Sequence, residues 1–244
     1  MLKIHKKFLL KAHQIAKKNF GNTFPNPSVG CVIVKNNKII STGVTAKTGR
    51  PHAEEIALTN AGKKSLGSTM YVTLEPCNHQ SYKGSCTNQI IRSGIKKIYI
   101  AKTDPDPRTN KKSIKRLKQN GLYVNVNLTN KNTYELNKFF FESLKNKRPY
   151  TKVKMAISED EKIAWYNYKS KWISNAKSRN FAHVLRNKSQ AIVTTSKTII
   201  KDNPRFNIRK NNKVTKYLPL IIIDNSLNTP IQSKIINSLT KRRI

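Results

Sequence analysis

Three short pieces of sequence decide the fold of this chain: His52-Ala53-Glu54, Pro76-Cys77 and Cys86. One imidazole and two thiolates form the ligand set of a catalytic zinc site, in which a fourth position stays open for water. Zinc lowers the pKa of that water toward neutrality. A carboxylate two residues from the histidine can then transfer the water's proton. We therefore predict zinc on His52, Cys77 and Cys86, and proton transfer by Glu54.

The sequence around these residues supports the site. Pro51 precedes a helical pattern, which puts the histidine and the glutamate in the first turn of a helix. Residues 70–75 form an expected strand that delivers the first cysteine at its carboxyl end, and the second cysteine opens an expected helix over 87–93. A helix N-terminus favours thiolate. The H-x-E spacing with a later Pro-Cys is typical of zinc deaminases, so we predict hydrolytic removal of an amino group from a ring.

The spacing of the two cysteines departs from the usual pattern. Zinc deaminases carry C-x-x-C, whereas residues 78–85 separate the two cysteines here. We expect this inserted loop to border the substrate. A lone histidine and two cysteines are more often buried structural residues, but that interpretation requires the strand end, both helix starts and the H-x-E spacing to coincide by chance.

The charge of the chain is its most unusual bulk property. Its 244 residues include 48 Lys and Arg against 12 Asp and Glu, a net charge of +36. Such a charge suggests a polyanionic partner. However, the lysines are spread through both halves and accompany many asparagines and isoleucines, as codon bias in an A/T-rich genome would produce. We therefore expect no nucleic-acid partner.

Hydropathy and cysteine content bear on the compartment. No run of eighteen apolar residues is present, so we expect no membrane span. Two of the three cysteines are assigned to metal, and Cys31 fits a buried core thiol. Free thiols are typical of a reducing compartment, and we expect the cytoplasm.

The order of elements predicts two α/β domains, residues 1–147 and 148–244, joined near Asn146 to Pro149. In the first, helices alternate with strands, which predicts a largely parallel sheet between helices. Its further expected elements are an amphipathic helix within 1–21, a hairpin of strands 29–34 and 38–44, strands 97–102 and 122–127, and helices 113–119 and 133–145.

The second half has fewer signals. We expect strands over 150–157, 190–194 and 218–224, a helix over 175–186 and a short helix toward Lys201. Three strands are few for an independent α/β domain, because their edges and faces need cover.

Longer motifs then point to a family. They are Thr23-x-Pro-Asn-Pro-x-Val-Gly-Cys-Val-Ile-Val34, Gly49-x-Pro-His-Ala-Glu54, and Tyr71-Val-Thr-Leu-Glu-Pro-Cys77-x-His79 with the delayed Cys86. They resemble the bifunctional riboflavin-biosynthesis deaminase–reductase. The resemblance continues through Arg148-Pro-Tyr, Lys154-Met-Ala-Ile-Ser158, Ser170-Lys-Trp-Ile173 and Thr198-x-x-x-Asp202-x-Pro-Arg205.

The resemblance implies a cytidine-deaminase-like three-layer α/β/α domain followed by an α/β domain like dihydrofolate reductase. It implies removal of an amino group from a phosphoribosylated diaminopyrimidinone, then reduction of the ribosyl chain with NADPH. By family position, NADPH would contact Ala156, Trp172, Thr198 and Asp202, and the substrate would contact Ser170, Arg186, Phe206 and Arg209 in the second domain and Asn26 and His79 in the first.

Several positions depart from the family. The usual Gly-(Arg/Lys)-Thr-Pro-Pro loop reads Ser81-Tyr-Lys-Gly-Ser85, with Lys83 one place from the usual basic residue. The family's later strands and its glycine-rich NADPH segment are not found before Ile244. We expect an incomplete reductase that does not reduce the product alone, and either a homo-oligomer or a partner chain that completes it.

Two other functions were weighed. A tRNA or nucleoside deaminase would share zinc and H-x-E and would use the positive charge, but it would carry C-x-x-C and no reductase-like half. A basic, non-catalytic remnant of a former enzyme would have no reason to keep all three zinc ligands together with Glu54.

Overall fold

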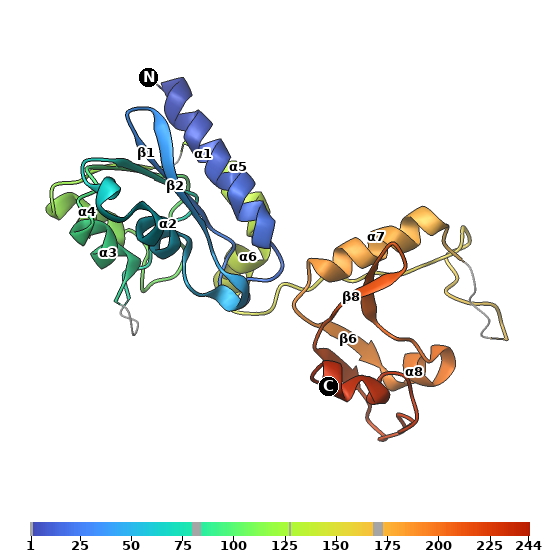
Figure 1. Cartoon of the computed structure of the whole chain (residues 1–244). Coiled ribbons are helices and arrows are strands. Elements are labelled where there is room, and N and C mark those ends of the chain that lie inside the picture. Colours follow the sequence, from blue (N-terminus) through green and yellow to red (C-terminus); the bar gives the residue numbers. More distant parts are fainter. Residues whose placement is uncertain (1, 80–83, 127, 168–172) are drawn as a thin grey trace. The chain divides into compact units, whose positions relative to one another are not determined.

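A computed structural model describes residues 2–79, 84–126, 128–167 and 173–244. Its internal contacts divide the chain into two units, Met1–Thr151 and Lys152–Ile244 (Figure 1). Each unit is described by itself. No helix of the described residues is long and apolar enough to cross a membrane.

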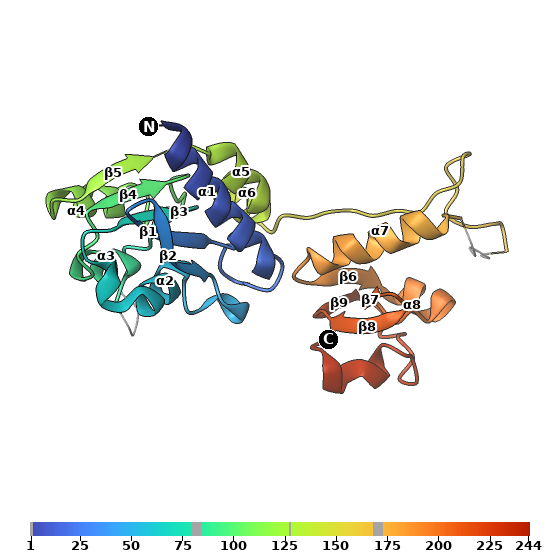
Figure 2. The same cartoon turned by 45° about the horizontal axis from the view of Figure 1, so that its top comes forward.

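The first unit is built on a five-stranded sheet. Its strands are β1 (Gly30–Lys35), β2 (Lys38–Val44), β3 (Thr69–Val72), β4 (Lys97–Ile100) and β5 (Tyr123–Val126). They lie in the order β2-β1-β3-β4-β5, which can be followed in Figure 2. The expected hairpin of β1 and β2 is present, with its turn at Asn36 and Asn37, both at positive φ. This geometry favours a tight hairpin turn.

Parallel pairing was expected after the hairpin and is found for β3, β4 and β5, whereas the antiparallel pairing of β1 with β3 was not predicted. β1 is antiparallel to both β2 and β3, and only β3, β4 and β5 are parallel to one another. The cause is the hairpin: the chain leaves β2, passes through helix α2 (Ala53–Ala61) and returns as β3 on the far side of β1. β2 and β3 therefore run in the same direction, with β1 reversed between them.

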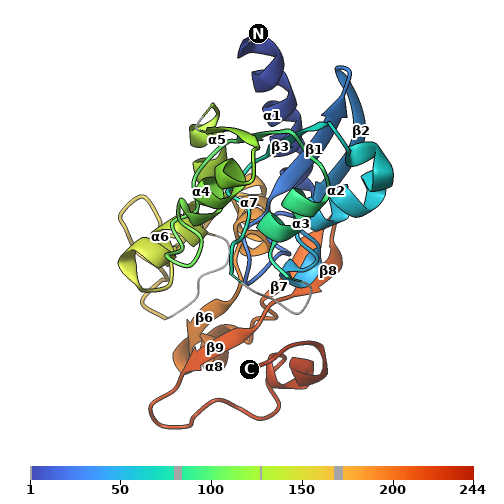
Figure 3. The same cartoon turned by 90° about the vertical axis from the view of Figure 1, so that its left-hand side faces the viewer.

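Side chains alternate across this sheet and form two cores. Cys31 and Ile33 of β1 join Met70 and Val72 of β3 in one core, whereas Val32, Val34 and Tyr71 join the other. A strand that is buried on both faces of its sheet needs apolar side chains pointing to each face. Helix α1 (Leu2–Ala16) covers the second core. Helices α2, α3 (Cys86–Arg92) and α4 (Lys112–Gln119) cover the first, and Figure 3 views the unit from the side of α3 and α4. The predicted three-layer α/β/α fold is confirmed.

The expected helix over 133–145 is two helices, α5 (Asn130–Leu136) and α6 (Lys138–Asn146), which meet at Asn137. The Asn137 side chain is fully buried and bonds to the backbone N–H and C=O of Ser28, in the turn that precedes β1. Its Oδ1 accepts from the Ser28 N–H at 2.8 Å, and its Nδ2 donates to the Ser28 carbonyl at 3.1 Å. The break in the helix therefore anchors the segment that carries Asn26.

Gly43 of β2 lies where α2 approaches the sheet closely. A Cβ atom there would lie 2.0 Å from the Ala53 carbonyl oxygen. Because backbone atoms cannot move aside, Gly43→Ala should push α2 from the sheet and lower the free energy of unfolding by about 1–3 kcal/mol. Denaturant unfolding followed by circular dichroism measures the loss. Thr42→Ala, at the neighbouring exposed position of β2, is the control and should stay within about 0.5 kcal/mol of wild type. Equal stability of the Gly43 variant and wild type would contradict the prediction.

The second unit contains two small sheets. β6 (Ile192–Thr195) pairs in parallel with β9 (Leu220–Ile223), and β7 (Asn207–Lys210) forms a hairpin with β8 (Lys213–Tyr217). Helices α7 (Ala176–Asn187) and α8 (Ser196–Asp202) agree with the expected elements. Short 3-10 helices lie at Lys17–Asn19, Lys47–Gly49 and Gly62–Ser65 in the first unit and at Ile236–Lys241 in the second.

Two expectations for this half were wrong. Residues 150–157 do not form a strand, and Val153 and Met155 are 83% and 65% exposed. A strand needs a neighbour for its backbone groups, and the described residues offer none to this segment. The β7–β8 hairpin was not predicted at all, so the described part of this unit holds four strands, not three.

Candidate metal centre and substrate pocket

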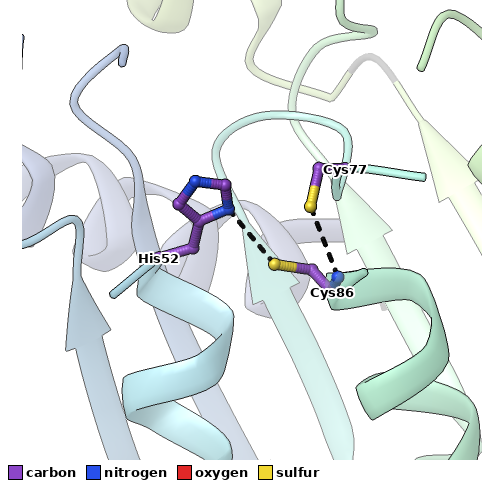
Figure 4. A group of neighbouring side chains, drawn as sticks. All are labelled: His52, Cys77 and Cys86. Atoms are coloured by element: carbon purple, nitrogen blue, oxygen red, sulfur yellow. Dashed lines mark hydrogen bonds between the residues drawn. The ribbon is translucent and has the colours of Figure 1, made fainter. Parts of the chain in front are cut away.

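The three predicted zinc ligands come from two helix starts and one loop. His52 is the N-cap residue of α2, one position before the expected first turn. Cys86 is the first residue of α3, and Cys77 lies in the loop after β3. Figure 4 shows the His52 ring and the two sulfur atoms turned toward one another.

The geometry of the three side chains fits a zinc ion. The His52 Nδ1 atom lies 3.3 Å from the Cys86 Sγ atom, and all three ligand atoms lie within 4.8 Å of one another. Tetrahedral zinc takes nitrogen at about 2.0 Å and sulfur at about 2.3 Å, which brings neighbouring ligand atoms to separations of this size. Two sulfurs and one imidazole nitrogen are also the donor set that zinc prefers.

The loop at Cys77 is fixed by the start of α3. The Thr87 N–H and hydroxyl donate to the Cys77 carbonyl at 3.2 and 2.9 Å, and the Cys86 N–H donates to the Cys77 Sγ atom at 3.3 Å. The contact between the two side chains lowers the pKa of Cys77 and raises that of Cys86. A lowered pKa favours the thiolate form of Cys77, which is the form that binds zinc.

Glu54 lies in the first turn of α2 and is 4% exposed. Burial raises the pKa of its carboxyl group to about 7, against an opposing effect of His52. A carboxyl group whose pKa lies near neutrality can both accept and release a proton at working pH.

A pocket opens beside the metal centre. Its lining includes the metal ligands His52 and Cys77, the carboxyl group of Glu54, the polar side chains of Asn26 and His79, and the ring of Phe140 in α6. The Asn26 Nδ2 atom donates to the Gly49 carbonyl at 2.8 Å and lies 3.2 Å from the His52 Nε2 atom. The structure therefore brings both predicted substrate residues of the first unit, Asn26 and His79, to the pocket that contains Glu54.

One wall of the pocket was not predicted as part of a site. Glu75, Asp104, Asp106 and Arg108 line it, each attached to the next. Glu75 Oε2 accepts from the Asp104 N–H at 3.2 Å, and Asp104 Oδ1 accepts from the Asp106 N–H at 2.9 Å. Burial raises the pKa of Asp104 to about 7, whereas the Arg108 hydrogen bonds lower that of Asp106. The sequence shows two acidic residues, in Asp104-Pro-Asp-Pro107, directly after a strand, but it does not indicate which other residues they meet.

In the second unit the structure brings three predicted residues together. The Arg186 guanidinium lies 5.5 Å from the centre of the Phe206 ring, and its Nη1 donates to the Asn207 carbonyl at 3.2 Å. The Arg209 Nε donates to the Asn207 Oδ1 at 3.0 Å. Arg186, Phe206 and Arg209 thus surround Asn207.

The other predicted residues of this unit come from other segments. Thr198 and Asp202 lie in the first and last turns of α8, whose Ile199 shares an apolar cluster with Phe206. Ala156 lies in the irregular segment after Thr151. Ser170 and Trp172 lie outside the described residues, as does Lys83 of the first unit.

The fold and the His/Cys/Cys cluster define a zinc-binding deaminase domain. Residues 2–102 match the family described as the cytidine and deoxycytidylate deaminase zinc-binding region. Residues 149–244 match the RibD C-terminal domain. The chain belongs to the RibD family of riboflavin biosynthesis proteins, which confirms the resemblance found in the sequence.

Individual relatives support this membership. The riboflavin biosynthesis protein RibD of Aquifex aeolicus is 41% identical over 236 residues, which is 96% of this chain and 66% of that protein. The RibD of Escherichia coli is 36% identical over 83% of this chain and 55% of its own length. Among solved structures, Acinetobacter baumannii RibD matches with a TM-score of 0.90 at 32% identity, covering 99% of this chain and 69% of that one. The chain thus spans a little over half to two thirds of the curated relatives.

Proposed function

We propose that the first unit is a zinc-dependent deaminase of riboflavin biosynthesis. Its substrate would be 2,5-diamino-6-(5-phosphoribosylamino)pyrimidin-4-one. The observation that carries the proposal is the cluster of His52, Cys77 and Cys86 beside a pocket that the buried Glu54 lines together with His52 and Cys77. A solved relative from Thermotoga maritima, 35% identical with a TM-score of 0.83, is named diaminohydroxyphosphoribosylaminopyrimidine deaminase/5-amino-6-(5-phosphoribosylamino)uracil reductase.

The residues of the pocket have separate roles in this reaction. Zinc, when bound, supplies Lewis-acid chemistry that lowers the pKa of a water molecule. Glu54 accepts a proton from the attacking water and delivers it to the departing amino group, so that amine and water become carbonyl and ammonia. Asn26 and His79 bind the pyrimidine from the pocket wall. The buried position of Glu54 keeps bulk water from competing for the proton.

The second unit carries the reductase part of the proposal. Arg186 and Arg209 would bind the phosphorylated substrate, since guanidinium groups suit phosphate. NADPH would be contacted by Ala156, Trp172, Thr198 and Asp202. Ser170 would contact the substrate. Val193, Ile221 and Ile223 are exposed on the β6–β9 sheet, which supports cover by a second copy or by another polypeptide. Three free cysteines support a cytoplasmic location.

The test is to incubate the zinc-loaded protein with the phosphoribosylated diaminopyrimidinone and to measure ammonia, with and without NADPH. Ammonia release independent of NADPH is the expected result. A tRNA or free nucleoside deaminated in place of this compound would contradict the proposal, and so would absence of ammonia from a protein that holds one zinc per chain.

A further inference from the structure

The deaminase pocket has a charge opposite to that of the chain. Four of the chain's 12 acidic residues line it, namely Glu54, Glu75, Asp104 and Asp106. Among the described residues that line the pocket, Arg108 is the only lysine or arginine. A net charge of +36 attracts anions from a distance, but a phosphate group that enters this pocket meets carboxyl groups. Coulomb repulsion inside a poorly solvated pocket is far stronger than in water.

Arg108 is held in place by a series of carboxylates that leads outward from the sheet. Glu75 is buried and accepts from the Ser113 hydroxyl at 2.7 Å as well as from the Asp104 N–H. The Asp104 carboxyl group accepts from the Asp106 N–H, and the Asp106 carboxylate accepts from Arg108. Each carboxylate fixes the next, and the series ends at a guanidinium group whose side chain is 68% exposed.

The guanidinium group of Arg108 keeps hydrogen-bond donors for a ligand. Its Nε lies 3.1 Å from both Asp106 carboxylate oxygens, and its Nη2 donates to Oδ2 at 2.6 Å. A guanidinium group has five N–H donors, so the Nη1 amino group is left without a partner among the described residues. Because Asp106 fixes the plane of the guanidinium group, little side-chain entropy remains to be lost on binding.

We propose that Arg108 is the specificity-determining residue that binds the phosphate of the deaminase substrate, an inference that rests on the proposed function. The aminated ring enters toward Glu54 and the metal ligands, and the phosphate stays at the exposed end of the wall, where Arg108 can donate to it. The acidic interior rejects the opposite orientation. Lys83, which the sequence suggested for a basic contact, is the alternative candidate.

The test compares the phosphorylated substrate with its dephosphorylated riboside in Arg108→Gln, Lys83→Gln and wild type. Arg108→Gln should raise the KM for the phosphorylated compound about tenfold, the effect of losing one hydrogen bond to a charged group. Its kcat, and the kcat/KM for the riboside, should stay within about twofold of wild type, because Arg108 does not touch the reacting atoms. Arg116→Gln, an exposed arginine of α4 outside the pocket, is the matched control and should change neither substrate.

The possible failures can be told apart. The preference for phosphate is the ratio of kcat/KM for the phosphorylated compound to kcat/KM for the riboside. If wild type releases ammonia from both compounds and the Arg108 variant keeps the same ratio, this inference is overturned and the proposed function stays intact. Loss of the preference in Lys83→Gln alone would overturn it as well, in favour of Lys83. An equal loss for both compounds in the Arg108 variant would indicate only a structural role. Absence of ammonia from wild type with either compound would overturn the proposed function and this inference together.

Discussion

Glu54→Gln is expected to abolish deamination while zinc binding is unchanged. The amide has nearly the shape of the carboxylate, so the first turn of α2 and the position of His52 should be preserved. However, an amide cannot accept a proton from water and return it to the leaving ammonia. Loss of a single acid–base group costs about 10²–10⁴-fold in rate, and we expect kcat for ammonia release to fall by at least about 100-fold.

The measurement is ammonia release at saturating substrate, with bound zinc determined on the same samples. Glu55→Gln is the matched control, since it removes a neighbouring carboxylate of α2 that does not line the pocket. That variant should stay within about twofold of wild type. If Glu54→Gln kept near-wild-type activity and Glu55→Gln did not, the proton-transfer role would belong to Glu55.

The metal ligands could be predicted from sequence because their positions are set by local structure. His52 and Cys86 each stand at a helix start, and Cys77 follows a strand. Proline, capping residues and the change from strand to helix pattern mark such places within a few residues of the ligand. The direction of β3 beside β1, in contrast, depends on how segments more than thirty residues apart pair, and no local pattern states it.

Two Asn-Asn hairpin turns show that the prediction of a hairpin depends on the residues of the flanking strands. Asn36-Asn37 and Asn211-Asn212 both have positive φ at both residues and both close a hairpin. The first was recognised because an apolar run precedes it. The second was missed because four of the nine residues of β7 and β8 are Lys or Arg and the two strands lack the alternation of a half-buried strand. Conversely, the apolar residues of 150–157 suggested a strand where the described structure provides no partner.

The acidic wall of the pocket could not be assembled from sequence at all. Glu75 follows β3 and Asp104 follows β4, and these two strands are parallel neighbours, so their carboxyl ends meet at one edge of the sheet. Pairing of distant segments again creates the site. Knowledge of the strand order would have placed Glu75, Asp104 and Asp106 beside the metal ligands.

Cys77→Ala and Cys86→Ala should each remove zinc from the protein. Wild type should hold one zinc per chain after dialysis against a weak chelator, and either variant close to none, because the site would keep only two protein ligands. Zinc that binds only the folded state stabilises it by about 4 kcal/mol at a free concentration 1,000 times its Kd. Added zinc should therefore raise the Tm of wild type and leave that of either variant unchanged.

Cys31→Ala separates metal loss from the mere loss of a buried thiol. Cys31 is fully buried in β1 and belongs to the core between the sheet and α2, not to the cluster of ligand atoms. Its replacement should cost about 1 kcal/mol of stability and leave the zinc content at one per chain. Each of the three variants loses one buried thiol group, so a difference in zinc content between them reports whether the lost sulfur coordinates zinc. Full zinc retention by Cys77→Ala or Cys86→Ala would show that the cluster of His52 and the two thiols is not the metal centre.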